Sequence, residues 1–225
     1  MTLCTAPTVS PLQLGDVHVW RVNLDVEARD LRFLLSSDEQ VRAASYAFSD
    51  DRRRFVVARA ALRRILAAYL HLSPREVSFE YGAAGKPTVR GVQFNASHCA
   101  NLALVAVSTQ PVGIDLEGVR PFPDALAVAS SLFTKEASAL LRATDARDRE
   151  RVFFELWTQH EARVKATGRG LVGGQASPEE HTWPSVTWTP AEGFVASLVC
   201  ETRSRLSVGE FDADVPPFGR LPASI

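Results

Sequence analysis

The sequence lacks several features that mark common classes of protein. Its three cysteines (Cys4, Cys99 and Cys200) are widely spaced and form no Cys-x-x-Cys pair, which argues against a disulfide framework or a zinc site. The formal net charge of -1 is not the basic balance typical of proteins that bind nucleic acid or membrane surfaces. No apolar run approaches the length of a membrane span, and no basic segment leads into an apolar one at the N-terminus. We therefore expect a cytoplasmic protein that binds neither nucleic acid nor membrane.

The composition is sufficient for a substantial core, because 46% of the 225 residues are hydrophobic. Residues 1–14 are rich in Thr, Ser and Pro and are expected to form a flexible tail. The segment 108–111 (Ser-Thr-Gln-Pro) is typical of a turn. We place the domain boundary there, with an N-terminal half over 15–110 and a C-terminal half over 111–225.

The N-terminal half contains one long predicted helix, over 50–70. One face of this helix carries apolar residues at helical spacing, and the remainder is crowded with arginines (Arg52, Arg53, Arg54, Arg59, Arg63 and Arg64). These arginines form either a solvated face or a surface for anions or an acidic partner, since guanidinium matches phosphate bidentately. Other predicted elements are a helix over 41–47 behind a capping box, and strands over 18–24, 77–81, 92–94 and 102–107.

The C-terminal half begins with the predicted strand 112–117, which carries Asp115 and Glu117. Side chains alternate along a strand, so both carboxylates point to one face while Ile114 and Leu116 point into the core. Paired carboxylates suit Mg²⁺, which also takes substrate phosphates as ligands. Because this pattern is common by chance, it does not establish a metal site alone. Two helices within 124–141, a helix over 148–167, a glycine-rich loop over 168–174 and three strands (185–189, 194–201 and 206–211) are expected to follow.

The helix predicted over 148–167 places Trp157, Glu161 and Lys165 on one face. Glu161 and Lys165 form either an ion pair at the edge of the core or part of a site. If this helix packs over the strand 112–117, Glu161 joins the two strand carboxylates around one magnesium ion. Positive charge for a phosphate-bearing substrate would come from four residues: Arg42, Lys86, His98 and Lys165. These residues indicate a magnesium-dependent enzyme of phosphate chemistry.

Four motifs occur in an order and spacing that resembles a known family. They are Gly85-Lys86-Pro87, Phe94-Asn95-Ala96-Ser97-His98, Gly113-Ile114-Asp115-Leu116-Glu117, and the run from Trp157 to Leu171. Together they resemble the 4′-phosphopantetheinyl transferases, in particular the larger, monomeric Sfp-type class. The resemblance implies an α+β fold of two similar α/β halves related by a pseudo-twofold, with coenzyme A between them. It also implies transfer of the phosphopantetheine arm to a serine of an acyl or peptidyl carrier protein, with release of 3′,5′-ADP.

The resemblance further implies a role for each matching residue. Asp115, Glu117 and Glu161 would hold Mg²⁺, and Glu161 would take the serine proton directly or through a metal-bound water. Lys165 would steady the departing phosphate, and His98, counted among the catalytic residues, would contact the phosphates with Ser97. The remaining matches, Arg42 and Lys86, would bind the adenosine end with its 3′-phosphate.

One position departs from the family pattern. The family usually has lysine directly before the glutamate of the Trp157 motif, and this chain has His160. Histidine is largely neutral at pH 7, so an interaction of that lysine with a phosphate, or with an acid such as Glu136, would be weakened. We expect activity to be retained with a changed pH dependence. Two alternatives are a magnesium-dependent phosphohydrolase or nucleotidyl transferase, and a degenerate homologue that binds coenzyme A or carrier without turnover.

Overall fold

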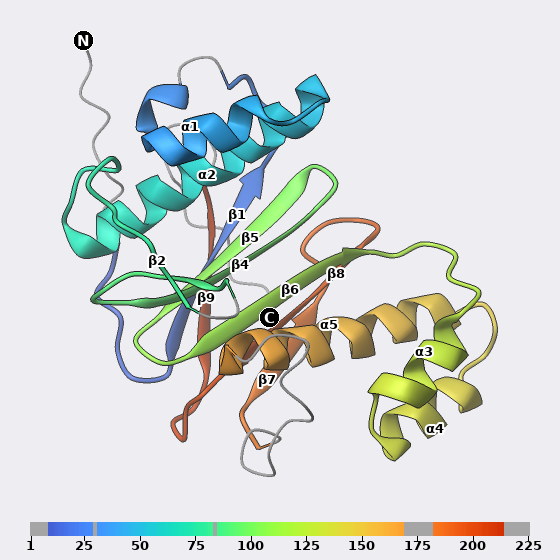
Figure 1. Cartoon of the computed structure of the whole chain (residues 1–225). Helices are drawn as coiled ribbons and strands as arrows, with labels where there is room; N and C mark the ends of the chain where they lie inside the picture. The colour runs from blue at the N-terminus through green and yellow to red at the C-terminus, as the bar shows by residue number, and fades with distance from the viewer. Residues whose placement is uncertain (1–8, 29–30, 83–84, 169–181, 214–225) are drawn as a thin grey trace.

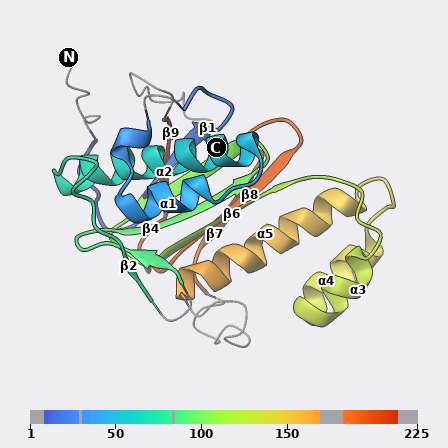
Figure 2. The same ribbon diagram turned by 45° about the horizontal axis from the view of Figure 1, so that its top comes forward.

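The protein has an α+β fold in which helices cover the outer faces of two sheets, as the computed structural model shows (Figures 1 and 2). The structure describes residues 9–28, 31–82, 85–168 and 182–213. The mixture of helices and sheets confirms the expected α+β class. In the described ranges, no helix combines the length and the apolar character needed to cross a lipid bilayer.

The first sheet has four strands in the order β4-β5-β1-β9. They are β1 (Asp16–Asn23), β4 (Gln93–Cys99), β5 (Leu102–Ser108) and β9 (Ser207–Asp212). β1 runs antiparallel to β5 and parallel to β9. The last described strand of the chain thus belongs to the sheet formed by the first strands, a long-range pairing that hydrophobic periodicity does not predict.

Helices cover the face of this sheet that is turned away from the second sheet (Figure 1). The short 3₁₀ helix η1 (Arg32–Leu34) precedes α1 (Ser37–Ala44) and α2 (Ser49–Leu70). Ile65 and Leu66 of α2 pack with Trp20 and Val105 in the largest core cluster. A small hairpin of β2 (Glu80–Tyr81) and β3 (Pro87–Thr88) follows α2.

The second sheet has three strands, in the order β6-β8-β7. They are β6 (Val112–Gly118), β7 (Ser185–Trp188) and β8 (Phe194–Cys200). Ile114 and Leu116 of β6 share a core cluster with Val19 and Leu104 of the first sheet. The opposite face of the second sheet is covered by α5 (Arg149–Thr167), while α3 (Ala125–Leu132) and α4 (Lys135–Ala143) pack together at the side of α5 (Figure 1).

A glycine allows α5 to lie directly on β6. A Cβ at Gly113 would stand 1.9 Å from the carbonyl oxygen of Ala162 and 2.4 Å from the nitrogen of Ala166. Both are backbone atoms of α5, so no side-chain movement could make room. The sequence allows Glu161 to join Asp115 and Glu117 only if the helix packs over the strand 112–117, and the structure shows this packing.

The capping-box prediction is confirmed at Ser36, whose backbone N–H donates to Glu39 Oε2 at 2.9 Å. Glu39 is also buried and accepts from Arg59 and, at 2.6 Å, from Arg63. Burial opposes its ionisation, but bonds from Arg63, Ser36 and Arg59 together hold the pKa of Glu39 below its ordinary value. The solvated-face interpretation of the arginine helix is therefore wrong for Arg63 and for Arg64, which are both buried.

Most other predicted elements are present with shifted ends. Helix α1 ends at Ala44 and the strand expected over 77–81 is paired only at its last two residues. Residues 95–98, expected between strands, lie within β4. The described part of the expected tail packs inward, with Val9 and Leu12 against the first core cluster. Gly168 ends α5 with φ 71°, and the rest of the predicted glycine-rich loop lies outside the described residues.

Candidate active site

Side chains of β4 join the two sheets at the point where β4 and β6 lie side by side. Asn95, Ser97 and Cys99 alternate along β4 and therefore point to the same face. Asn95 Oδ1 accepts from the backbone N–H of Ile114 at 2.9 Å, and Cys99 Sγ accepts from that of Gly118 at 3.2 Å. Between these two bonds, Ser97 Oγ donates to Asp115 Oδ1 at 3.0 Å. The motif residues of β4 thus fix the position of Asp115.

Asp115 and Lys165 form an ion pair between β6 and α5. Lys165 Nζ lies 2.6 Å from Asp115 Oδ1 and donates to Ser97 Oγ at 3.2 Å. Asp115 is 5% exposed, so this contact lies where solvent screens charge little. The ion pair considered from the sequence, between Glu161 and Lys165, is not formed; Lys165 instead pairs with Asp115 on the neighbouring strand.

Glu161 lies one helical turn before Lys165, on the same face of α5. Burial and then the Asp115 carboxylate raise the pKa of Glu161 above its ordinary value; Glu117 adds to this effect and Lys165 opposes it. Two buried oxygens of this group, Glu161 Oε1 and Asp115 Oδ2, have no hydrogen-bond partner. Buried carboxylate oxygens without donors are costly unless a cation or a proton satisfies them.

The three acids are close enough to interact but do not form a closed ligand shell. Glu117 Oε2 accepts from Arg120 Nη1 at 3.0 Å, and Asp115 is paired with Lys165. Within the described ranges, no group of three or more His, Cys, Asp or Glu side chains has the arrangement of a metal site. The unsatisfied oxygens of Asp115 and Glu161 nevertheless fit a hard divalent cation, which prefers oxygen ligands.

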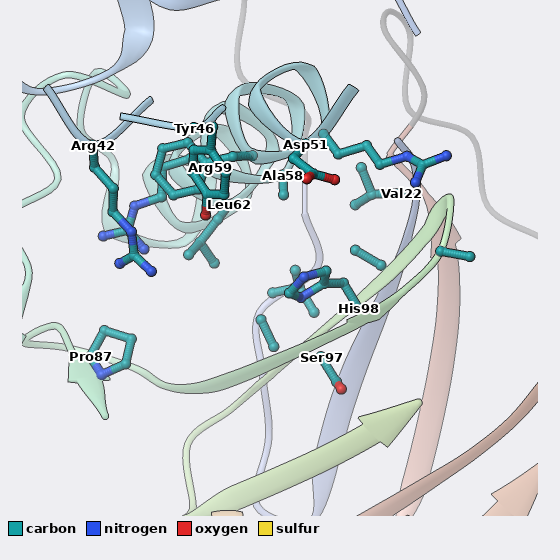
Figure 3. Close-up of a pocket in the computed structure, with 16 residues that line it drawn as sticks. Val22, Arg42, Tyr46, Asp51, Ala58, Arg59, Leu62, Pro87, Ser97 and His98 are labelled. Carbon is teal, nitrogen blue, oxygen red and sulfur yellow. The ribbon is translucent and has the colours of Figure 1, made fainter. Parts of the chain in front are cut away.

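A cavity of about 580 Å³ lies between α1, α2 and β4, on the other face of the first sheet. Figure 3 shows His98 directed from β4 into this cavity while Ser97 points the opposite way, toward β6. Arg42 and His98, both predicted from the sequence, line it. Arg54 and Arg59 also line it; both belong to the arginine cluster that the sequence indicated as either a solvated face or an anion surface. Tyr46, a further lining residue, was not predicted. Guanidinium groups around one cavity suit an anion, and here Arg54 and Arg59 are also paired with Asp25 and Glu39.

Lys86 lies apart from this cavity. Its ammonium group donates to the backbone carbonyl of Lys165 at 2.6 Å and approaches that of Val112 at 3.5 Å. Burial lowers the pKa of Lys86. The next residue, Pro87, does line the cavity. Of the predicted phosphate-binding residues, the structure therefore brings Arg42 and His98 together at the cavity, which Ser97 also borders. The hydroxyl of Ser97 bonds to Asp115 and Lys165, and Lys86 lies at the end of α5.

His160 faces a second cavity, of about 500 Å³, between α5 and the segment joining α3 to α4. Glu136, Lys135 and Arg163 line the same cavity, and the His160 ring lies 6.1 Å from that of Phe133. His160 thus faces a different side of α5 from Glu161 and Lys165.

Comparison with known sequences identifies the class of protein that carries this site. A sequence model of the 4′-phosphopantetheinyl transferase superfamily matches residues 111–205, and a model of the N-terminal part of 4′-phosphopantetheinyl transferases matches residues 23–110. The chain is 42% identical over 166 residues to the 4′-phosphopantetheinyl transferase HetI of Nostoc sp., covering 69% of this chain and 70% of HetI.

Two further relatives agree with this match. A putative 4′-phosphopantetheinyl transferase of Synechocystis sp. is 37% identical, over 66% of this chain and 63% of the relative. The 4′-phosphopantetheinyl transferase Sfp of Bacillus subtilis is 26% identical, over 61% and 62%. The chain belongs to the 4′-phosphopantetheinyl transferase family, and the expectation from its motifs is confirmed. Its activity is phosphopantetheinyl transfer, and coenzyme A is the substrate of the family.

Proposed function

We propose that Asp115, Glu117 and Glu161 hold a magnesium ion against the pyrophosphate of coenzyme A, while α5 supplies the base and a cation. When bound, the ion would neutralise charge on the pyrophosphate oxygens. The observation that supports this most is the pair of buried oxygens without partners, Asp115 Oδ2 and Glu161 Oε1. Two carboxylates buried close together repel each other, and a bound cation relieves this repulsion.

In the reaction, a serine hydroxyl of an acyl or peptidyl carrier protein attacks the phosphorus that bears the pantetheine arm. The bond from this phosphorus to 3′,5′-ADP breaks as the new ester bond forms. Glu161 accepts the serine proton, a role that its raised pKa suits. Lys165 supplies positive charge to the departing phosphate. Its ammonium group is held in the site by Asp115, one of the proposed ligands of the ion.

The remaining cations bind the nucleotide end of coenzyme A. His98 and Arg42 reach the 580 Å³ cavity with Arg54, and we assign the 3′-phosphate to it because guanidinium pairs with phosphate bidentately. Ser97, on the other face of β4, contacts the pyrophosphate from the side of Asp115. We further propose that the enzyme acts as a monomer in the cytoplasm.

The test is a transfer assay with coenzyme A, magnesium and several apo carrier proteins, read as the mass of the carrier. A phosphopantetheine adduct in the presence of the wild type, lost with Glu161→Gln, is the expected result. Hydrolysis of a phosphate ester without any adduct would instead identify a phosphohydrolase. Binding of coenzyme A with neither reaction would identify a non-catalytic homologue.

A further inference from the structure

Lys86 is bonded to the segments that carry the active site, although it comes from the N-terminal half. It immediately precedes β3, and its ammonium group donates to the carbonyl of Lys165 at 2.6 Å. A second, longer contact of 3.5 Å reaches the carbonyl of Val112, the first residue of β6. One side chain therefore touches both the end of α5 and the start of β6.

The ammonium group of Lys86 lies at the end of α5, where the helix carbonyl groups need hydrogen-bond donors. The last four carbonyl groups of a helix have no partner within the helix, and the helix dipole makes this end negative. Gly168 turns the chain away there with φ 71°. The side chain of Lys86 packs over that turn, since a Cβ at Gly168 would meet Lys86 Cδ at 3.8 Å. Lys86 thus acts as a capping cation supplied from outside the helix.

The capped residue is itself part of the site. The carbonyl of Lys165 accepts from Lys86, while its ammonium group holds Asp115 at 2.6 Å. A change at the carbonyl would shift the side chain and, one turn earlier, Glu161. Lys86 also makes no contribution to the cavity lined by Arg42 and His98.

We propose that Lys86 is a positioning residue, which sets Lys165 and Glu161 relative to Asp115 by holding the end of α5 on β6, and is not a ligand of coenzyme A. This inference rests on the proposed roles of Glu161 and Lys165. It separates the motif Gly85-Lys86-Pro87 into two functions, because Pro87 lines the coenzyme cavity and Lys86 does not.

The experiment compares the wild type with Lys86→Met and Lys86→Arg, measuring kcat for transfer and the dissociation constant of coenzyme A by calorimetry. Lys86→Met keeps the length of the chain and removes the donor. We expect kcat to fall about tenfold or more, because small displacements of catalytic groups are costly, with coenzyme A affinity unchanged. Lys86→Arg should recover most of kcat, since guanidinium can also donate to carbonyl oxygens.

Two controls make the result specific. Thr88→Val removes a hydrogen bond within the same hairpin, from Thr88 Oγ1 to the carbonyl of Glu80, and should leave kcat unchanged. Dephospho-coenzyme A, which lacks the 3′-phosphate, reports whether Lys86 contacts that group. Weaker binding of coenzyme A by Lys86→Met, with no change for dephospho-coenzyme A, would overturn the inference.

Three further outcomes distinguish a failure of this inference from a failure of the proposed site. A wild-type kcat for Lys86→Met would overturn the positioning role, whereas a wild-type kcat for Glu161→Gln would overturn the proposed site whatever Lys86 does. If Lys86→Met does not fold, Lys86→Arg decides, because most of the wild-type kcat at unchanged coenzyme A affinity supports the inference and weaker coenzyme A binding contradicts it.

Discussion

Replacing Gly113 by alanine should separate α5 from β6 and misplace the active site. The added Cβ would stand 1.9 Å from the Ala162 carbonyl oxygen, and ordinary contacts of this kind are about 3.5 Å. Relief therefore requires a movement of about 1.5 Å, shared between β6 and α5. This movement would most directly lengthen the 2.6 Å contact between Lys165 Nζ and Asp115 Oδ1.

Two magnitudes follow from this movement. Overpacking of a close-packed interface costs about 1–3 kcal/mol, and the backbone clash places Gly113→Ala at the upper end. A displacement of about 1 Å at catalytic groups costs about 100-fold in rate. The affinity for coenzyme A should fall much less, because the cavity with Arg42 and His98 lies on the far face of the first sheet.

Thermal unfolding, kcat for transfer and coenzyme A calorimetry measure these three effects. Gly82→Ala is the matched control, since a Cβ there would have its nearest neighbour at 4.0 Å, and it should behave as the wild type. A Gly113→Ala variant with wild-type stability and kcat would refute the reasoning that close approach of α5 to β6 forms the site.

Four further predictions test other parts of the structure. Asn95→Leu leaves the buried N–H of Ile114 without a partner, which should cost about 1–3 kcal/mol in urea unfolding and lower kcat; a variant as stable as the wild type would remove Asn95 from the support of Asp115. Glu39→Leu leaves Arg59 and Arg63 without their carboxylate partner and should lower the free energy of unfolding by about 3–5 kcal/mol. A loss of less than about 1 kcal/mol would mean that the group of Glu39, Arg59 and Arg63 does not stabilise the fold. The pKa of Glu161 is raised in the folded protein, so its contribution to stability is present below the ordinary glutamate pKa of about 4.5 and is lost as the pH rises through the raised value. In metal-free buffer, Glu161→Gln should therefore raise the melting temperature more at neutral pH than at acid pH. A difference that stays constant with pH would contradict this. His160→Lys replaces a titratable ring by a permanent positive charge and should change the pH–rate profile, and an identical profile would show that the charge at this position does not matter.

The local elements could be predicted from the sequence because their signals are local. Helix α2 and strand β6 carry clear periodicity, and the break between α3 and α4 falls at Phe133, as expected. The acids Asp115 and Glu117 were found by strand alternation, and Glu161 by helical spacing.

The contacts that complete the site depend on long-range packing, which these patterns do not contain. Lys86 and Lys165 are 79 residues apart, and nothing near either residue indicates that one caps the helix of the other. The burial of Arg63 depends likewise on Glu39, which the sequence identified only as a capping acid. The structure brings the motif residues Ser97 and Lys165 to Asp115 and shows which atoms connect them.

The most direct test of the central claim is binding of Mn²⁺, as a spectroscopic substitute for Mg²⁺, in the presence of coenzyme A. Electron paramagnetic resonance of free Mn²⁺ gives its affinity for the wild type, for Asp115→Asn and for Glu161→Gln. Asp145→Asn, at an exposed carboxylate with 79% of its side chain accessible, is the control. We predict one Mn²⁺ site that both site variants weaken and the control does not. Equal Mn²⁺ affinity in all four proteins would contradict the claim that these acids form the metal site.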